Sequence, residues 1–143
     1  MRKRTHFDPY TGTGWPEPAW LAPYFLTSAG RRKFFAGGND SWGLKVEGVD
    51  GTEHLPPAER IDIDLTILGD REGVLLFYHR MSAVDGEAYY SKGDLRRLYT
   101  WIETAHGDIR PLGLFIPFET AWKAVKEFIE TDGALPKSIV WVA

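Results

Sequence analysis

The chain has 143 residues, no cysteine and a formal net charge of −3 at pH 7. Its length predicts a single domain over residues 1–143 with a hydrophobic core of its own. The lack of cysteine excludes disulfides, thiolate metal sites and cysteine nucleophiles, and with them the zinc-dependent nucleobase deaminases, whose metal needs Cys ligands.

The start of the chain is basic but has no apolar segment of the kind that a signal peptide contains. No apolar run in the sequence approaches the roughly 18 residues that a membrane helix needs. We therefore expect a cytoplasmic protein that makes no membrane contact, and the absence of cysteine agrees with that compartment.

The first 40 residues are expected to form an irregular and partly helical segment. Residues 1–19 are rich in Gly, Pro and aromatic residues, which indicates an irregular arm. Residues 20–36 fit a short helix that is interrupted near Pro23 or Gly30.

From residue 41 onward the sequence has the alternation of apolar and polar residues that is typical of strands. The clearest case is 61–67, whose odd-numbered positions are all apolar. Residues 95–103 fit either a helical face or a strand, and the aromatic residues Tyr99 and Trp101 favour the strand. Strands are expected at 42–49, 61–67, 74–78, 87–90, 99–102 and 138–142.

A helix is expected at about 118–131, because Ala124, Val125 and Phe128 recur at the spacing of one helix face. Pro117 suits its first turn and Gly133 its end. The elements of 41–143 together predict an α+β fold. It is an antiparallel β-sheet of about five to six strands with the C-terminal helix packed on one face and an irregular N-terminal segment.

Several packing and turn residues of the second half occur in a characteristic order. They are Ser91, Gly93 and Asp94, then Tyr99 and Trp101, Ile116-Pro117, Ala124-Val125, Phe128, Pro136 and Trp141. Over about the last 80 residues this order resembles the Imm1 family of bacterial immunity proteins. The resemblance implies a protein without catalytic activity that binds and neutralises a polymorphic toxin, often a deaminase or nuclease acting on nucleic acid.

The charge is unevenly distributed, since residues 34–72 hold nine acidic and three basic residues. An acidic surface suits a protein that covers the basic, nucleic-acid-binding active site of a toxin. We expect carboxylates and aromatic rings to make that contact, with the rings as desolvated hot spots. The candidate toxin-binding residues are Asp62, Asp64, Glu87, Tyr89, Tyr90, Asp94, Trp101 and Glu103.

Two other functions remain open. The sequence Asp62-Ile-Asp64-Leu-Thr66 matches the Asp-x-Asp-x-Thr signature of haloacid-dehalogenase-type phosphatases, which use Mg²⁺, although alternation with apolar residues favours a solvent-facing strand. The basic triplets at 2–4 and 31–33 would suit a nucleic-acid-binding accessory protein. The four histidines have no metal-binding spacing, so no metal, cofactor or catalytic residue is expected.

Overall fold

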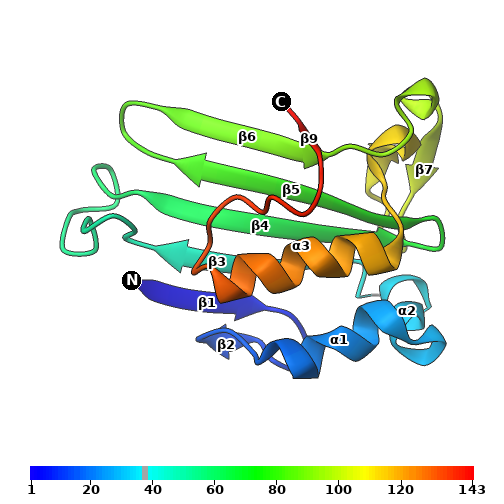
Figure 1. Cartoon of the computed structure of the whole chain (residues 1–143), viewed down its shortest axis with the longest axis horizontal. Coiled ribbons are helices and arrows are strands. Elements are labelled where there is room, and N and C mark those ends of the chain that lie inside the picture. Colours follow the sequence, from blue (N-terminus) through cyan, green and yellow to red (C-terminus); the bar gives the residue numbers. More distant parts are fainter. Residues whose placement is uncertain (37–38) are drawn as a thin grey trace.

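A seven-stranded antiparallel sheet forms the centre of the protein (Figure 1). The computed structural model describes residues 1–36 and 39–143. The strands are ordered β2-β1-β3-β4-β5-β6-β9, so that β4 and β5 lie in the middle. Their bounds are β1 Arg2–His6, β2 Gly12–Thr13, β3 Ser41–Glu47, β4 Asp62–Asp70, β5 Gly73–Met81, β6 Gly86–Ser91 and β9 Trp141–Val142.

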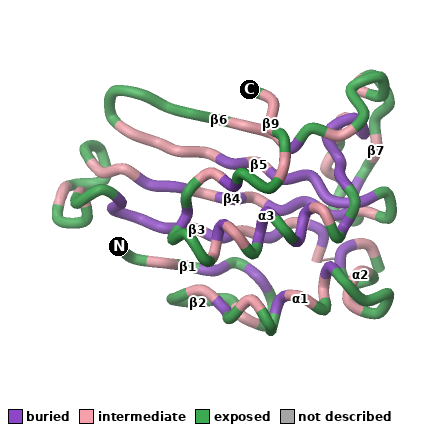
Figure 2. The backbone as a smooth tube through the Cα atoms, in the orientation of Figure 1, coloured by how far each residue is buried: buried purple, intermediate pink, exposed green. Residues whose placement is uncertain are grey.

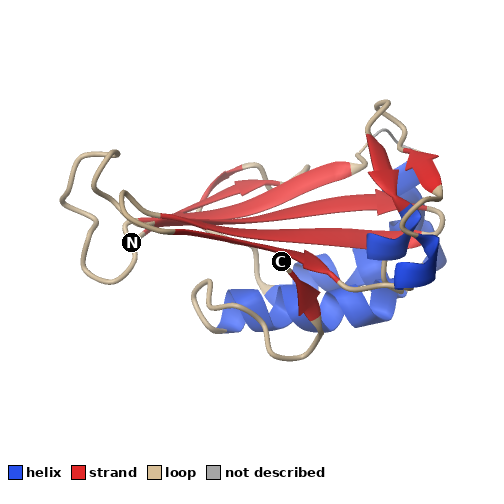
Figure 3. Cartoon of the chain, turned by 90° about the horizontal axis from the view of Figure 1, so that it is seen from above, coloured by secondary structure: helices blue, strands red, loops and turns tan. Residues whose placement is uncertain are grey.

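Helices cover one face of this sheet and a small second sheet lies against one end of the other face (Figure 3). The helices are α1 Pro18–Leu26, α2 Ser28–Phe35 and α3 Phe118–Glu130. The second sheet pairs β7 (Trp101–Glu103) with β8 (Ile109–Pro111), and the 3₁₀ helices η1 (Leu95–Arg97) and η2 (Leu112–Leu114) flank it. None of the described helices combines the length and apolar character that a membrane crossing requires.

The main core lies between the helices and the sheet, where the buried stretches of the central strands face α3 (Figure 2). Leu44, Leu65 and Leu76 of the sheet and Phe34 and Phe128 of the helices are fully buried there. Gly69 of β4 makes room for α2, because a Cβ at that position would lie 1.9 Å from Cδ1 of Phe34.

A second apolar cluster lies on the opposite face and holds the small sheet in place. It consists of Leu68, Leu75, Leu112, Leu114 and Phe115, with Ile102 of β7 packed against it. Because successive side chains of a strand point to opposite faces, β4 and β5 supply residues to both clusters. The sheet is therefore an internal layer at this end.

The α+β fold class predicted from the sequence is confirmed, and so are the strand at 61–67 and the C-terminal helix. Of residues 95–103, for which a strand was favoured, only Trp101–Glu103 form one (β7), and Leu95–Arg97 form the 3₁₀ helix η1. The C-terminal strand is shorter than expected, because the backbone N–H groups of Lys137 and Ser138 donate to the carboxylate of Glu127.

The arm expected to be irregular contains β1, which pairs with β3 along its whole length. Its alternation is weak in the sequence, because only Thr5 and Phe7 bury their side chains. Arg2 and Arg4 face the other way and pair with Glu47 of β3. The strand is thus fixed by a partner about 40 residues away, which a local pattern does not reveal.

Truncating Phe128 tests the packing of α3. We expect Phe128→Ala to lower the free energy of unfolding by about 3–5 kcal/mol, because the ring is fully buried between α3 and the sheet. Urea denaturation measures this change, and Glu130→Ala, at an exposed position of the same helix, is the control. Equal midpoints for Phe128→Ala and wild type would contradict this packing.

Candidate functional site

The face of the sheet away from the helices carries rows of charged side chains. The strand register aligns Arg4, Lys45, Asp64 and His79 across β1, β3, β4 and β5. The next row aligns Arg2, Glu47 and Asp62. Like charges lie side by side in both rows, at Arg4 and Lys45 and at Glu47 and Asp62, but most of these charges also have an opposite charge close by, such as Glu47 beside Arg2 and Arg4.

Asp62 is engaged within the protein. Its carboxylate accepts hydrogen bonds from Nε of Arg60 at 2.8 Å and from the backbone N–H of Gly48 at 3.0 Å, and the residue is 9% exposed. Burial alone would raise the pKa of this carboxyl, but the hydrogen bonds from Arg60 and Gly48 outweigh it and hold the pKa below its usual value. Asp62 thus holds the loop between β3 and β4 against the sheet.

Asp64 lies one row further along, between Lys45 and His79, and is half-buried. Burial raises the pKa of its carboxyl, and the charges of Lys45 and His79 offset this only in part. Both aspartates lie inside an antiparallel strand, whereas the phosphatase motif needs them beyond the end of a parallel one. Within residues 1–36 and 39–143 no group of three His, Asp or Glu side chains could hold a metal ion.

The two basic triplets do not gather on one surface. Arg2 and Arg4 lie on the charged face and contact Glu47, while Lys3 points to the helix side and pairs with Asp132. A guanidinium nitrogen of Arg31 lies 3.1 Å from a carboxylate oxygen of Glu119 on α3. Much of their charge is thus neutralised locally, which disfavours a nucleic-acid-binding surface.

The outer side of the small sheet presents large apolar side chains to solvent. Trp101 and Glu103 alternate with the inward-facing Ile102, and Ile109 lies opposite Glu103 on the same side. Trp101 is 59% exposed, Ile109 57% and the preceding Tyr99 92%. We call Trp101, Glu103 and Ile109, together with the exposed Tyr99 that precedes Trp101 by two residues, the aromatic face. Exposed rings of this kind, grouped beside a carboxylate, are typical of protein–protein contact sites.

A buried carboxylate anchors the turn between β7 and β8. Asp40, just before β3, has no exposed surface and accepts the backbone N–H of His106 at 2.9 Å. It also pairs with the His106 ring and accepts from the Thr104 hydroxyl. Burial opposes ionisation of Asp40, but these hydrogen bonds together prevail and lower its pKa. The aromatic face is therefore attached to the sheet at its turn as well as through the second cluster.

The remaining candidates lie in three places: the helix side of β6, the charged face and the start of η1. Glu87 and Tyr89 of β6 point to the helix side, while Tyr90 points to the charged face and stacks on Phe77 with ring centroids 4.6 Å apart. Asp94 caps η1 and accepts from Arg96, whose side chain lowers the pKa of this carboxyl. The eight residues thus do not form one site, and of the shared surfaces only the one that holds Trp101 and Glu103 exposes a large apolar side chain beside a carboxylate.

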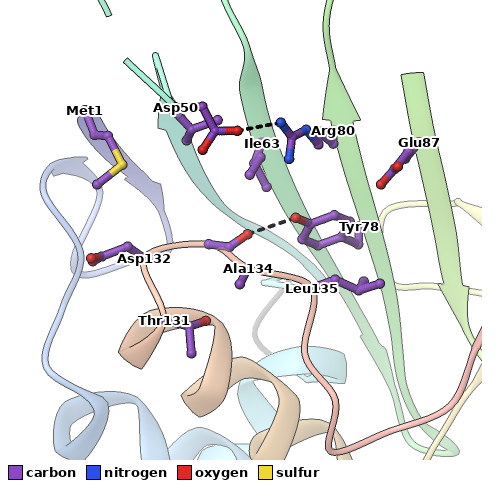
Figure 4. Close-up of a pocket in the computed structure, with 12 residues that line it drawn as sticks. Met1, Asp50, Ile63, Tyr78, Arg80, Glu87, Thr131, Asp132, Ala134 and Leu135 are labelled. Atoms are coloured by element: carbon purple, nitrogen blue, oxygen red, sulfur yellow. Dashed lines mark hydrogen bonds and ion pairs between the residues drawn. The ribbon is translucent and has the colours of Figure 1, made fainter. Parts of the chain in front are cut away.

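A pocket of about 390 Å³ lies where the loop after α3 meets the sheet (Figure 4). The Tyr78 hydroxyl donates to the carbonyl oxygen of Gly133 at 2.9 Å, and burial raises the pKa of Tyr78 to about 12. Arg80 pairs with Asp50 at 2.7 Å. These polar groups bind each other and connect the end of α3 to the sheet, so the pocket wall is mainly structural.

The family model described as Immunity protein Imm1 matches residues 39–143. The chain belongs to the Imm1 family of immunity proteins. The match spans β3 to β9 and includes Asp40, the aromatic face and all eight candidate residues, while β1, β2, α1 and α2 lie outside it. No curated protein and no solved structure matches the chain. Imm1 membership implies a protein partner, the cognate toxin.

Sequence reasoning did not identify two residues of the aromatic face as contact candidates. Tyr99 was expected in a strand, but it lies in the turn before β7 and is almost fully exposed. Ile109 follows a Gly-Asp turn, and its exposure is set by the pairing of β8 with β7. The sequence signal that could have identified Ile109 is an apolar residue that lies opposite a charged residue in a short hairpin.

Replacing Asp40 tests the anchor of the aromatic face. We expect Asp40→Asn to lower the free energy of unfolding by about 1–3 kcal/mol, because an amide cannot replace a carboxylate that accepts all these bonds. The pKa of Asp40 is lowered by folding, so its contribution is present above the ordinary pKa and is lost as the pH falls through the folded-state value.

Urea denaturation between about pH 5 and about pH 2 should therefore show a steeper loss of stability in wild type than in Asp40→Asn. Glu103→Gln, on the exposed side of the same hairpin, is the matched control and should leave the profile unchanged. Parallel profiles for wild type and Asp40→Asn would contradict the role of Asp40.

Proposed function

We propose that this Imm1 protein binds a secreted toxin that acts on nucleic acid, such as a deaminase or a nuclease, and neutralises it by covering its active site. The action takes place in the cytoplasm and needs no chemistry from the immunity protein. The observation that carries the proposal is the aromatic face, which exposes Tyr99, Trp101 and Ile109 without a covering element.

The chemistry of this face suits a nucleic-acid-binding cleft. Such a cleft combines basic residues that contact phosphates with apolar surfaces on which bases stack. Glu103 offers a carboxylate in place of a phosphate, and the rings of Tyr99 and Trp101 offer flat apolar surfaces in place of bases. The aromatic face would then contact both the basic residues and the base-stacking surfaces of the cleft.

The attachment of the face favours tight binding. A surface that is ordered before it binds loses little conformational entropy on association. Ile102 packs into the second cluster and Asp40 holds the turn, so the outward side chains stand on a fixed support. A small number of side chains can then supply most of the affinity.

A truncation at the centre of the aromatic face tests this function. We expect Trp101→Ala to weaken binding to the cognate toxin domain by about 30-fold or more, the loss that corresponds to a hot spot of about 2 kcal/mol. Calorimetry measures the affinity, and survival of cells that express the toxin measures protection.

Trp20→Ala is the matched control, because Trp20 is similarly exposed but lies on α1, on the other side of the sheet. Equal affinity of wild type and Trp101→Ala would exclude the aromatic face as the contact. Occlusion is tested by competition, since saturating immunity protein should prevent an oligonucleotide substrate from binding the toxin. A ternary complex would show inhibition from a separate site.

A further inference from the structure

Part of the outer edge of β6 has no neighbouring strand. β5 pairs with β6 from Gly86 to Tyr90, but β9 pairs with it only at Tyr90 and Ser91. Figure 1 shows β6 at the margin of the sheet with β9 beside one end of it. Residues 86–89 therefore form a free strand edge within the described part of the chain.

The direction of the backbone groups on this edge follows from two hydrogen bonds. The N–H of Ser82 donates to the carbonyl of Asp85 in the β5–β6 turn, so Asp85 faces β5, and alternation makes Glu87 and Tyr89 face β5 as well. The N–H of Lys92 donates to Val140 next to β9, so Lys92 faces outward. By the same alternation, each of these two hydrogen bonds indicates that the N–H and C=O groups of Gly86 and Ala88 point outward, away from β5.

The side chains on this edge do not obstruct an approaching strand. Gly86 and Ala88, whose backbone groups point outward, have the smallest side chains of β6 and are exposed. Natural proteins usually protect such edges with Pro, Lys, a bulge or a covering element. Residues 86–89 contain neither Pro nor Lys, and β9 covers only the far end of β6.

We propose that an extended segment of the cognate toxin adds to β6 as an antiparallel strand, in line with β9, and places a basic side chain beside Glu87. This inference rests on the proposed function, that the protein binds a toxin. The backbone groups of Gly86 and Ala88 supply hydrogen bonds to the added strand, as in other cases of strand addition.

The charges at the edge select a basic partner. Asp85 and Glu87 are exposed, and neither has a salt-bridge partner among the described residues. The neighbouring Arg80 is held by Asp50 at 2.7 Å, so Glu87 remains available at the side of the pocket (Figure 4). A Lys or Arg across from Glu87 would form a cross-strand ion pair and could extend into that pocket.

The same charges disfavour a second copy of this chain. Two copies pairing antiparallel through Gly86 and Ala88 would place Glu87 opposite the same residue of the other copy. A shift of two residues toward the turn would place Asp85 opposite Glu87, and a shift the other way would need Tyr90, which already pairs with Val142. Like charges directly opposite each other destabilise a strand pair.

A proline at an outward-facing position tests the proposal. We expect Ala88→Pro to weaken binding of the cognate toxin domain by roughly tenfold or more, because it removes an outward N–H and its ring occupies the edge. The matched control Ala88→Thr keeps the N–H and the strand and should bind within about twofold of wild type. Equal binding by Ala88→Pro, with melting curves showing a folded protein, would overturn the proposal.

Amide hydrogen exchange of wild type gives a second readout that needs no variant. The Gly86 and Ala88 amides should exchange rapidly in the free protein and slowly in the complex, whereas those of Glu87 and Tyr89 should be protected in both. Rapid exchange at Gly86 and Ala88 in the complex would overturn strand addition while leaving toxin binding intact.

Two further outcomes separate the possibilities. A wild-type dimer that Ala88→Pro converts to monomer would assign the edge to a second copy and overturn the inference. Failure of wild type to bind the toxin domain at all would overturn the proposed function on which the inference rests.

Discussion

The pairing of β4 with β3 and β5 is the constraint on which the rest of the structure depends. Because side chains alternate between faces, this register sends Ile63, Leu65 and Ile67 to the helix side and Asp62 and Asp64 to the other. A shift of one residue would place carboxylates in the core. The register also brings Leu68 next to Leu75, and this pair forms the base on which the small sheet rests.

The small sheet depends on that base in two ways that differ chemically. Its inner side packs through Ile102 on the second apolar cluster, which is insensitive to pH. Its turn is held by Asp40, whose carboxylate accepts bonds from His106 and Thr104 that favour the ionised form and weaken when the group is protonated. Both contacts therefore hold the aromatic face in place, and one of them comes from Asp40, which is fully buried.

The sequence revealed those elements whose pattern is local. Strict alternation over 61–67 and the apolar face of 118–130 are complete within a few residues, and both predictions were confirmed. β1 depends on a distant partner, and its pattern is limited to Thr5 and Phe7, so it was not foreseen. For the site, alternation correctly separated Asp62 from the apolar positions of its strand, but the expected exposure to solvent is wrong for Asp62, which is only 9% exposed. Alternation did not reveal that Arg60 and Gly48 would use the Asp62 carboxylate, because that depends on how the 48–60 loop folds back.

The two surfaces proposed to bind the toxin lie apart from the residues that hold the two apolar clusters together. On the aromatic face, Trp101, Glu103 and Ile109 point away from the second cluster, so substitutions there leave the packing of Ile102 intact. Along β6 the outward backbone groups do not depend on side-chain identity, and Glu87 is exposed. Trp101, Glu103, Ile109 and Glu87 can therefore change at little cost in stability, because none of them belongs to the main core, whereas Tyr89 of β6 packs against it. A fold arranged in this way can follow a partner whose own surface varies while its central sheet and α3 stay the same.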